Sequence, residues 1–187
     1  MDTAAQKLRD GDADALPVLL RESAAAANEG VFKRSLADPA CSGMGTTLVA
    51  VITRSGETAI ANIGDSRCYW LRDGRIRQVT RDHSLVRDLV DRGVITEAEA
   101  QNHPRKNIIT RAVGLDSKVK CDVFLPQLQK EDQLLLCSDG LSNMVSQAEI
   151  LDIILCHESL EDACNALLSR ALECGAPDNV TILLMNS

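Results

Sequence analysis

The stretch TTLVAVITRSGETAIANIGDSRCYWLRDGRIRQVT, residues 46–80, alternates short apolar runs with turn dipeptides. This pattern is typical of β-strands that are joined by tight turns. Because such short turns leave no room for a crossover helix, we expect the strands to form an antiparallel meander. The predicted strands are 46–53, 57–63, 67–72 and 76–80, and the turns are Ser55-Gly56, Gly64-Asp65 and Asp73-Gly74.

Helical sequence lies on both sides of this stretch. Residues 3–35 are rich in Ala, Leu, Glu, Lys and Arg, which are strong helix formers. Pro17 suits an early turn of this helix, residues 11–14 supply a cap, and Asp38-Pro39 ends it. Residues 84–113 also have helical character. This segment is polar and contains glycine and proline, so we expect a mobile excursion from the sheet.

The remainder of the chain predicts further strands and helices around capping boxes. Strands are expected at 121–126, at 133–140 and at 180–185; the second is apolar on both faces and therefore central, and the last is expected to be buried. Capping boxes at 96–99 and 146–149 open helices, the second running to about His157. A further helix runs from Ser159 to about Cys174, with one apolar face formed by Leu160, Ala163, Leu167 and Leu168.

Composition limits the classes of function. The chain has 187 residues, of which 45% are hydrophobic, and no linker or repeat, so we expect one α+β domain over residues 1–187. The net charge of −7 argues against a nucleic acid or an anionic membrane as partner. The seven cysteines form no C-x-x-C pair, which favours buried free thiols in a reducing cytoplasm. We see no signal peptide and no apolar run of about 20 residues, so we expect a cytoplasmic protein.

Three aspartates share one context, a turn with small neighbours beside an apolar strand. They are Asp65 in ANIGDSR, Asp139 in LLLCSDGLS and Asp178 in GAPDNVTILLM. Strand ends place such carboxylates at the rim of a sheet, and carboxylate oxygens suit Mg²⁺ or Mn²⁺. Each aspartate taken alone is better explained as a turn former or a helix cap, whereas for the three together this explanation and a metal site are equally good.

Four motifs in order closely resemble those of bacterial metal-dependent Ser/Thr protein phosphatases of type 2C. The resemblance covers about Leu20 to Leu184 and implies two face-to-face antiparallel β-sheets flanked by helices, an αββα sandwich that is incomplete at its N-terminal strands. The motifs are ANIGDSRCYWLRDGRIRQVTRDHS (61–84), LVRDLVDRGVITEAEAQNHPRKNIITRAVG (85–114), LLLCSDGLSNMV (134–145) and APDNVTILL (176–184).

The resemblance implies the activity and the roles of single residues. It implies hydrolysis of phosphoserine and phosphothreonine in phosphorylated proteins, with two or three Mn²⁺ or Mg²⁺ ions that activate the attacking water. Asp139 and Asp178 correspond to metal ligands of the family. Asp65 corresponds to the aspartate that joins Asp139 at a third, weaker metal site. Residues from about 84 to 114 correspond to the flap, a segment beside the site that affects substrate access.

The sequence departs from the family at its opening motifs. The family begins with strands that carry an Arg-x-x-Asn-x-Asp-like stretch and an Asp-Gly-Met-Gly-Gly turn, whose aspartate bridges both catalytic metals. SGMGTT, residues 42–47, is similar to the later Gly-Thr-Thr segment, so Gly45, Thr46 and Thr47 are expected to be structural and Ser42 is not a lost ligand. Asp10-Gly11 lacks a preceding apolar strand and is not expected to replace the bridging aspartate.

Two functions follow from this departure. The first is a phosphatase that is weak or inactive as this shortened chain and binds fewer ions than the complete site. The second is a pseudophosphatase, a regulatory or phosphoprotein-binding module that has lost catalysis. Because the absence of sheet strands exposes the edges of their neighbours, we also expect self-association.

Other polar residues have less specific expectations. His83 is expected to be packed or hydrogen-bonded rather than catalytic, and His103 and His157 to be structural or solvated. Arg67 is expected to orient the Asp65 turn. Arg105-Lys106 and Arg111 either attract a phosphopeptide or are simply solvated.

Overall fold

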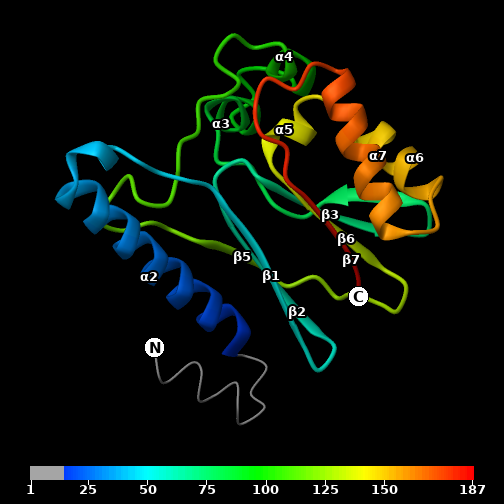
Figure 1. Ribbon diagram of the computed structural model, residues 1–187, viewed down its shortest axis with the longest axis horizontal. Helices are drawn as coiled ribbons and strands as arrows, with labels where there is room; N and C mark the ends of the chain where they lie inside the picture. The colour runs from blue at the N-terminus through cyan, green and yellow to red at the C-terminus, as the bar shows by residue number, and fades with distance from the viewer. Residues whose placement is uncertain (1–14) are drawn as a thin grey trace. The chain divides into compact units, whose positions relative to one another are not determined.

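The computed structural model describes residues 15–187, which divide into two compact units (Figure 1). Unit 1 consists of residues 15–65 and Asp82–Gln127, and unit 2 consists of Ser66–Arg81 and Leu128–Ser187. Each unit is built on one antiparallel sheet with helices, as the predicted α+β class requires. The predicted cap at 11–14 and Asp10-Gly11 lie outside the described residues.

Unit 1 contains a three-stranded sheet of order β1-β2-β5. Its elements are α2 (Ala15–Ala37), the 3-10 turn η1 (Pro39–Cys41), β1 (Leu48–Arg54), β2 (Glu57–Ile63), α3 (Leu85–Asp91), α4 (Glu97–Gln101) and β5 (Asp122–Phe124). β1 and β2 form a hairpin in which Leu48 is opposite Ile63 and Arg54 is opposite Glu57. The Ser55-Gly56 turn between them was predicted and is confirmed.

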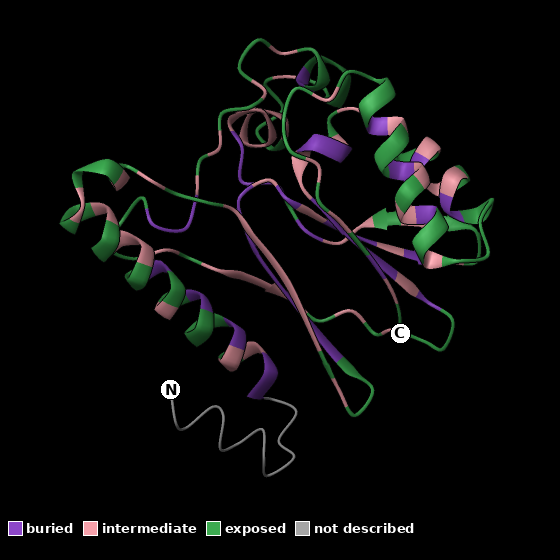
Figure 2. Ribbon diagram, viewed as in Figure 1, coloured by how far each residue is buried: buried purple, intermediate pink, exposed green. Residues whose placement is uncertain are grey.

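Helix α2 packs on this sheet through one stripe of residues. Pro17 lies in its first turn, and Asp38 follows its last residue and caps η1, as predicted. Leu16, Leu20, Ala24 and Asn28 are buried at a spacing of four residues, which places them on one face of a helix (Figure 2). Leu16 and Leu20 pack in one apolar cluster with alanines of β2.

The polar member of this stripe, Asn28, attaches α2 to the loop before β5. Its Oδ1 accepts a hydrogen bond from the Gly114 backbone N–H at 2.8 Å, and its Nδ2 donates to the Asp116 carbonyl at 3.0 Å. Gly114 has φ +92°, and a Cβ there would lie 2.2 Å from Cγ1 of Val31. Both the left-handed backbone and the close approach therefore require glycine at this position.

Unit 2 contains a four-stranded sheet of order β4-β3-β6-β7. Its elements are β3 (Arg67–Arg72), β4 (Arg75–Gln78), β6 (Gln133–Cys137), α5 (Asp139–Ser142), α6 (Gln147–Leu155), α7 (Leu160–Glu173) and β7 (Ile182–Asn186). β6 is an interior strand, as its apolar sequence predicted. The core joins Tyr69 and Leu135 of the sheet to Ile150 of α6 and Leu167 of α7.

The four consecutive strands do not form a meander, so that prediction is wrong. β1 and β2 pair in unit 1, whereas β3 and β4 pair in unit 2. β2 has β1 and β5 on its two edges, and β3 has β4 and β6, so neither has an edge left for the other. Gly64-Asp65 therefore links two sheets instead of forming a hairpin turn.

Three further predictions are corrected in detail. β7 is an edge strand with Leu184 buried and Leu183 50% exposed, so it is not a buried strand. On α7 the buried face consists of Ala163, Leu167 and Ala171, whereas Leu168 is 37% exposed. The predicted helix over 84–113 is wrong beyond α4, where turns follow His103-Pro104 because proline and the residue before it disfavour a helix.

Other local predictions are confirmed. Capping boxes open α4 at Thr96 and α6 at Ser146. All seven cysteines are free thiols, and burial raises the pKa of Cys68 to about 12. The predicted burial holds only for Cys68 and Cys137, since Cys41, Cys121 and Cys164 are half-buried. Cys156 and Cys174 are exposed, because they are the C-caps of α6 and α7. No helix within residues 15–187 is long and apolar enough to cross a bilayer.

We predict that Gly114→Ala lowers the free energy of unfolding by roughly 2–3 kcal/mol, because the added methyl group overlaps Val31 at a strained backbone. Urea unfolding measures this change. The matched control is Gly30→Ala at an exposed position of α2, where the added Cβ meets no atom within 4 Å. This variant should raise the free energy of unfolding by about 0.5–1 kcal/mol, because alanine has the higher helix propensity. Equal stability of the two variants would contradict the prediction.

Candidate functional site

Asp139 and Asp178 lie on two segments of unit 2 that are bonded to each other. Beyond the last ladder pair, Cys137 with Ile182, the Ser138 N–H donates to the Thr181 carbonyl at 3.1 Å. The Ser138 hydroxyl accepts from the Thr181 N–H at 3.0 Å and donates to the Asn179 carbonyl at 3.2 Å. Since Ser138 precedes Asp139 and Asn179 follows Asp178, these bonds bring both predicted aspartates to one end of β6 and β7.

Gly140 allows the two segments to approach this closely. A Cβ at this position would lie 2.4 Å from the Asn179 carbonyl oxygen, a backbone atom that has no freedom to swing aside. The Ser-Asp-Gly sequence therefore has a physical reason at each position. Ser138 bonds the neighbouring segment, Asp139 supplies a carboxylate, and Gly140 leaves the space that the contact needs.

Each of the two carboxylates has one oxygen engaged by a nearby donor. Asp139 is half-buried, and its Oδ2 accepts from Nδ2 of Asn143 at 3.2 Å. Asp178 is exposed, and its Oδ1 accepts from the Asn179 N–H at 2.7 Å. Oxygen donors of this kind fit a hard divalent cation such as Mn²⁺ or Mg²⁺. Within the described part of unit 2, no group of three or more His, Cys, Asp or Glu side chains that could hold a metal ion is found.

Asp65 is the last residue of the first segment of unit 1, and it follows β2 and Gly64. It is half-buried, and a Cβ on Gly64 would lie 2.4 Å from Cγ2 of Thr47. Thr46 exchanges two backbone hydrogen bonds with Val113, at 3.0 and 2.8 Å. The structural role predicted for the Gly-Thr-Thr segment is confirmed by these contacts. Because Asp65 and the other two aspartates belong to different units, the three-aspartate site stays a prediction.

His83 is packed and hydrogen-bonded, as predicted. Its side chain is fully buried, and its two ring nitrogens contact the Gly64 N–H at 3.0 Å and Oδ2 of Asp122 at 3.1 Å. Nη1 of Arg111 lies 3.0 Å from Oδ1 of Asp122. Burial raises the pKa of Asp122, but the His83 hydrogen bond and the Arg111 charge outweigh it and hold the pKa below its usual value. Arg111 is therefore engaged with a carboxylate of its own unit.

Sequence reasoning missed Asp122 and Asn28. Asp122 is a charged residue at the start of the short strand DVF, and Asn28 is a polar residue at a core position of a helical stripe. Both signals are visible in the sequence once the strand and the stripe are known. Neither residue lies in a motif that suggested chemistry.

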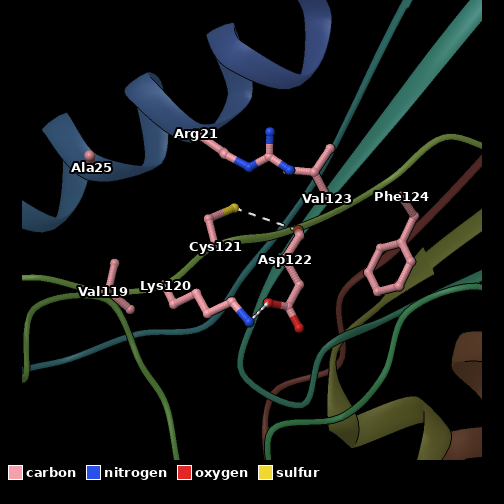
Figure 3. A pocket seen from close by; sticks show the side chains of 8 residues that line it. All are labelled: Arg21, Ala25, Val119, Lys120, Cys121, Asp122, Val123 and Phe124. Carbon is pink, nitrogen blue, oxygen red and sulfur yellow. Dashed lines mark hydrogen bonds and ion pairs between the residues drawn. The ribbon is translucent and has the colours of Figure 1, made fainter.

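A cavity of about 600 Å³ lies between α2 and the segment that enters β5 (Figure 3). Its charged lining is mixed, and Nζ of Lys120 lies 3.7 Å from Oδ1 of Asp122. None of the three predicted metal ligands lines it. The lining residues are Arg21, Ala25, Val119, Lys120, Cys121, Asp122, Val123 and Phe124.

Comparison with known proteins gives consistent matches. The family model "Protein phosphatase 2C" matches residues 2–179. The serine/threonine phosphatase stp of Listeria welshimeri is 42% identical over 173 residues, which are 92% of this chain and 69% of that protein. The crystal structure of the serine/threonine phosphatase Stp1 from Staphylococcus aureus matches with a TM-score of 0.88 and 36% identity, over 92% of this chain and 68% of that one.

A third match is a crystal structure of the catalytic domain of the serine threonine protein phosphatase PstP in complex with two manganese ions. It has a TM-score of 0.81 and 36% identity, over 89% of this chain and 69% of that chain. Together the matches cover both units of the chain, and they agree with the observed pair of antiparallel sheets with flanking helices.

We predict that Ser138→Ala separates the two aspartate segments, because the Thr181 N–H and the Asn179 carbonyl lose their side-chain partner. The free energy of unfolding should fall by roughly 1–2 kcal/mol, and the Thr181 amide should exchange with deuterium faster. Ser169→Ala is the matched control: its hydroxyl donates only within α7, and its stability should change by less than about 0.5 kcal/mol. An unchanged Thr181 exchange rate would contradict the prediction.

Proposed function

The chain belongs to the protein phosphatase 2C family, and we propose that it acts as a metal-dependent protein serine/threonine phosphatase. The substrates would be phosphoserine and phosphothreonine residues of phosphorylated proteins. The junction of Ser138-Asp139-Gly140 with Asp178-Asn179 is the observation that carries this proposal. It supports the proposal because its two aspartates stand in the motifs that hold metal in the family.

We propose Asp139 and Asp178 as ligands of Mn²⁺ or Mg²⁺, with Asp65 as a ligand of a further, weaker ion. When bound, such ions activate a water molecule for in-line attack on phosphorus and offset the charge of the phosphoryl group. The contribution of the chain's own residues is orientation. Asn143 holds one oxygen of Asp139, and Ser138 holds the backbone beside Asp178. The manganese ions of the PstP structure are consistent with this choice of metal.

We further propose that this 187-residue chain, on its own, is weakly active or inactive. The complete site of the family contains two or three ions and a bridging aspartate from an Asp-Gly-Met-Gly-Gly turn. In this chain residues 42–47, SGMGTT, correspond to the later Gly-Thr-Thr segment and not to that turn, so they do not supply the bridging aspartate. Asp139 and Asp178 without a bridging carboxylate form at most a partial site for one ion, so fewer ions are expected here.

The same partial donor set favours a second candidate function, a pseudophosphatase. Such a module would keep the fold and bind or regulate a phosphoprotein without hydrolysing it. The two functions differ in one measurable property, which is turnover of a phosphopeptide by the chain.

Two further proposals concern where the protein acts and what it avoids. All seven cysteines are free thiols, which supports a reducing cytoplasm as its location. The net charge of −7 supports phosphoproteins rather than nucleic acids or anionic membranes as partners.

We predict that calorimetric titration with manganese shows fewer than two tight sites and that phosphopeptide hydrolysis stays far below family-like turnover. Asp139→Asn and Asp178→Asn should each weaken the remaining manganese binding by roughly tenfold or more, because each removes a charged oxygen donor. Asp152→Asn, an exposed aspartate on α6, removes the same charge and should leave binding unchanged.

Two tight manganese sites together with normal turnover would overturn the partial-site proposal. Undetectable turnover with intact phosphopeptide binding would favour the pseudophosphatase.

We also propose that the chain self-associates through sheet edges. β1 and β5 border the sheet of unit 1, and β4 and β7 border the sheet of unit 2. The outer edge of β1 is the longest of those in unit 1, with seven residues, LVAVITR. Unpaired backbone groups on such an edge form hydrogen bonds with a second strand. An apolar, β-branched strand of this length is a suitable template for pairing.

We predict that light scattering gives an average mass above that of the monomer and that this mass rises with protein concentration. Thr53→Lys places a charge on the exposed end of β1 and should reduce association. Ser169→Lys adds the same charge on α7 and should leave association unchanged. A clean monomer at high concentration would contradict self-association.

A further inference from the structure

A polar cluster in unit 1 surrounds Gly64, the residue before Asp65. The Gly64 N–H donates to Nδ1 of His83 at 3.0 Å. The Gly64 carbonyl accepts from the His83 N–H at 2.9 Å and from Nδ2 of Asn62 at 3.3 Å. His83 and Asn62 together therefore satisfy both backbone groups of Gly64.

These contacts determine which ring nitrogen of His83 carries the proton. Nδ1 must be an acceptor, because the Gly64 N–H points at it, so in the neutral ring Nε2 carries the hydrogen. Nε2 then donates to Oδ2 of Asp122 at 3.1 Å. Nη1 of Arg111 lies 2.9 Å from Nε2, but both atoms are donors, and they lie close because both converge on the Asp122 carboxylate.

The cluster also joins the flap to β5. The His83 carbonyl accepts from the Thr110 N–H at 2.8 Å, and Ser84 forms a bridge with Ile109, so both stems of the flap meet at His83. Asp122 is the first residue of β5, where it is paired with Asn62 of β2. The imidazole is thus held from one side by a carboxylate of the sheet and is presented to Gly64 on the other.

We propose that His83, in its neutral Nε2–H form, is a positioning residue that sets the orientation of Asp65. It does so by holding the N–H of Gly64, the residue that directly precedes Asp65, while Asp122 fixes the imidazole ring. The proposal deepens the proposed function, because it rests on Asp65 being a metal ligand. His83 itself is not a ligand, since both of its nitrogens are occupied by Gly64 and Asp122.

Two substitutions separate the two ring nitrogens. Asn has its amide oxygen near the position of Nδ1, so His83→Asn keeps an acceptor for Gly64 and loses the donor to Asp122. Gln has its amide nitrogen near the position of Nε2, so His83→Gln keeps the donor to Asp122 and loses the acceptor for Gly64. Ala27→Gly weakens α2 of the same unit at an exposed position, away from the cluster, and it is the control for a general loss of stability.

The first measurement concerns the turn alone and uses nuclear magnetic resonance of the whole chain. In the wild type, the ring nitrogens of His83 should show the Nε2–H tautomer. Deuterium exchange of the Gly64 amide should be roughly tenfold faster in His83→Gln and changed less than about threefold in His83→Asn. The opposite tautomer, or equal Gly64 exchange in His83→Gln and wild type, would overturn the proposal, whatever the stability of the variants.

The second measurement concerns metal and uses manganese ions alone as the probe. Bound Mn²⁺ should broaden the amide resonances of residues 64–66, and Asp65→Asn should abolish this. His83→Gln should need roughly 10–100-fold more manganese for the same broadening, whereas His83→Asn and Ala27→Gly should stay near wild type.

The outcomes of the two measurements distinguish the two proposals. If manganese causes no broadening at residues 64–66 in the wild type, the metal role of Asp65 fails, and the Gly64 exchange rates still decide whether His83 holds the turn. If Asp65 binds manganese equally well in wild type and His83→Gln, the proposed function stands and the positioning role of His83 is overturned.

Discussion

Backbone N–H groups at the ends of strands and helices lack partners within their own element, and burial makes an unpaired group costly. In this chain three polar side chains supply such partners. Ser138 accepts the N–H of Thr181, His83 accepts the N–H of Gly64, and Asn28 accepts the N–H of Gly114. The Ser138 and Asn28 bonds join residues that are 43 and 86 positions apart in the sequence, and the His83 bond joins residues that are 19 positions apart. The first bond holds together the segments that carry Asp139 and Asp178, the second holds the turn before Asp65, and the third holds α2 to the loop before β5.

The parts of the fold that depend on neighbouring residues were predicted well from the sequence. The hairpins at Ser55-Gly56 and Asp73-Gly74 formed because turn residues and alternating apolar residues act over a few positions. Membership in a sheet depends on distant strands, so the pattern over 46–80 did not indicate that β5 and β6 fill the free edges of β2 and β3. The prediction that the C-terminal strand is buried was wrong for the same reason. Its apolar run is compatible with an edge strand as well as with a buried one.

The candidate site was predicted in the same uneven way. Asp139 and Asp178 were predicted from the sequence because Ser-Asp-Gly and Asp-Asn are short motifs, and the structure brings their segments together at two strand ends. In unit 1, the residue that holds His83 beside the Asp65 turn was missed. Asp122 has no motif, and its effect arises only when β5 pairs with β2 and brings it to His83 and Arg111. A polar residue inside an apolar strand or stripe is the available signal, and it points to a buried hydrogen-bond partner without naming it.

Gly64 and His83 lie next to the two points at which the chain leaves unit 1 and returns to it, so their contact closes this excursion at its base. The chain leaves unit 1 after Asp65 and returns to it at Asp82. Gly64 and His83, one on each side of this excursion, exchange a backbone hydrogen bond and a backbone to side-chain hydrogen bond. The β3–β4 hairpin therefore starts from a stem whose two ends are already joined. Closing the stem in unit 1 fixes the loop ends, so the residue at its base loses little further conformational freedom when it is ordered. Asp65 is that residue, so in its proposed role as a metal ligand its backbone would need little further ordering when a cation binds.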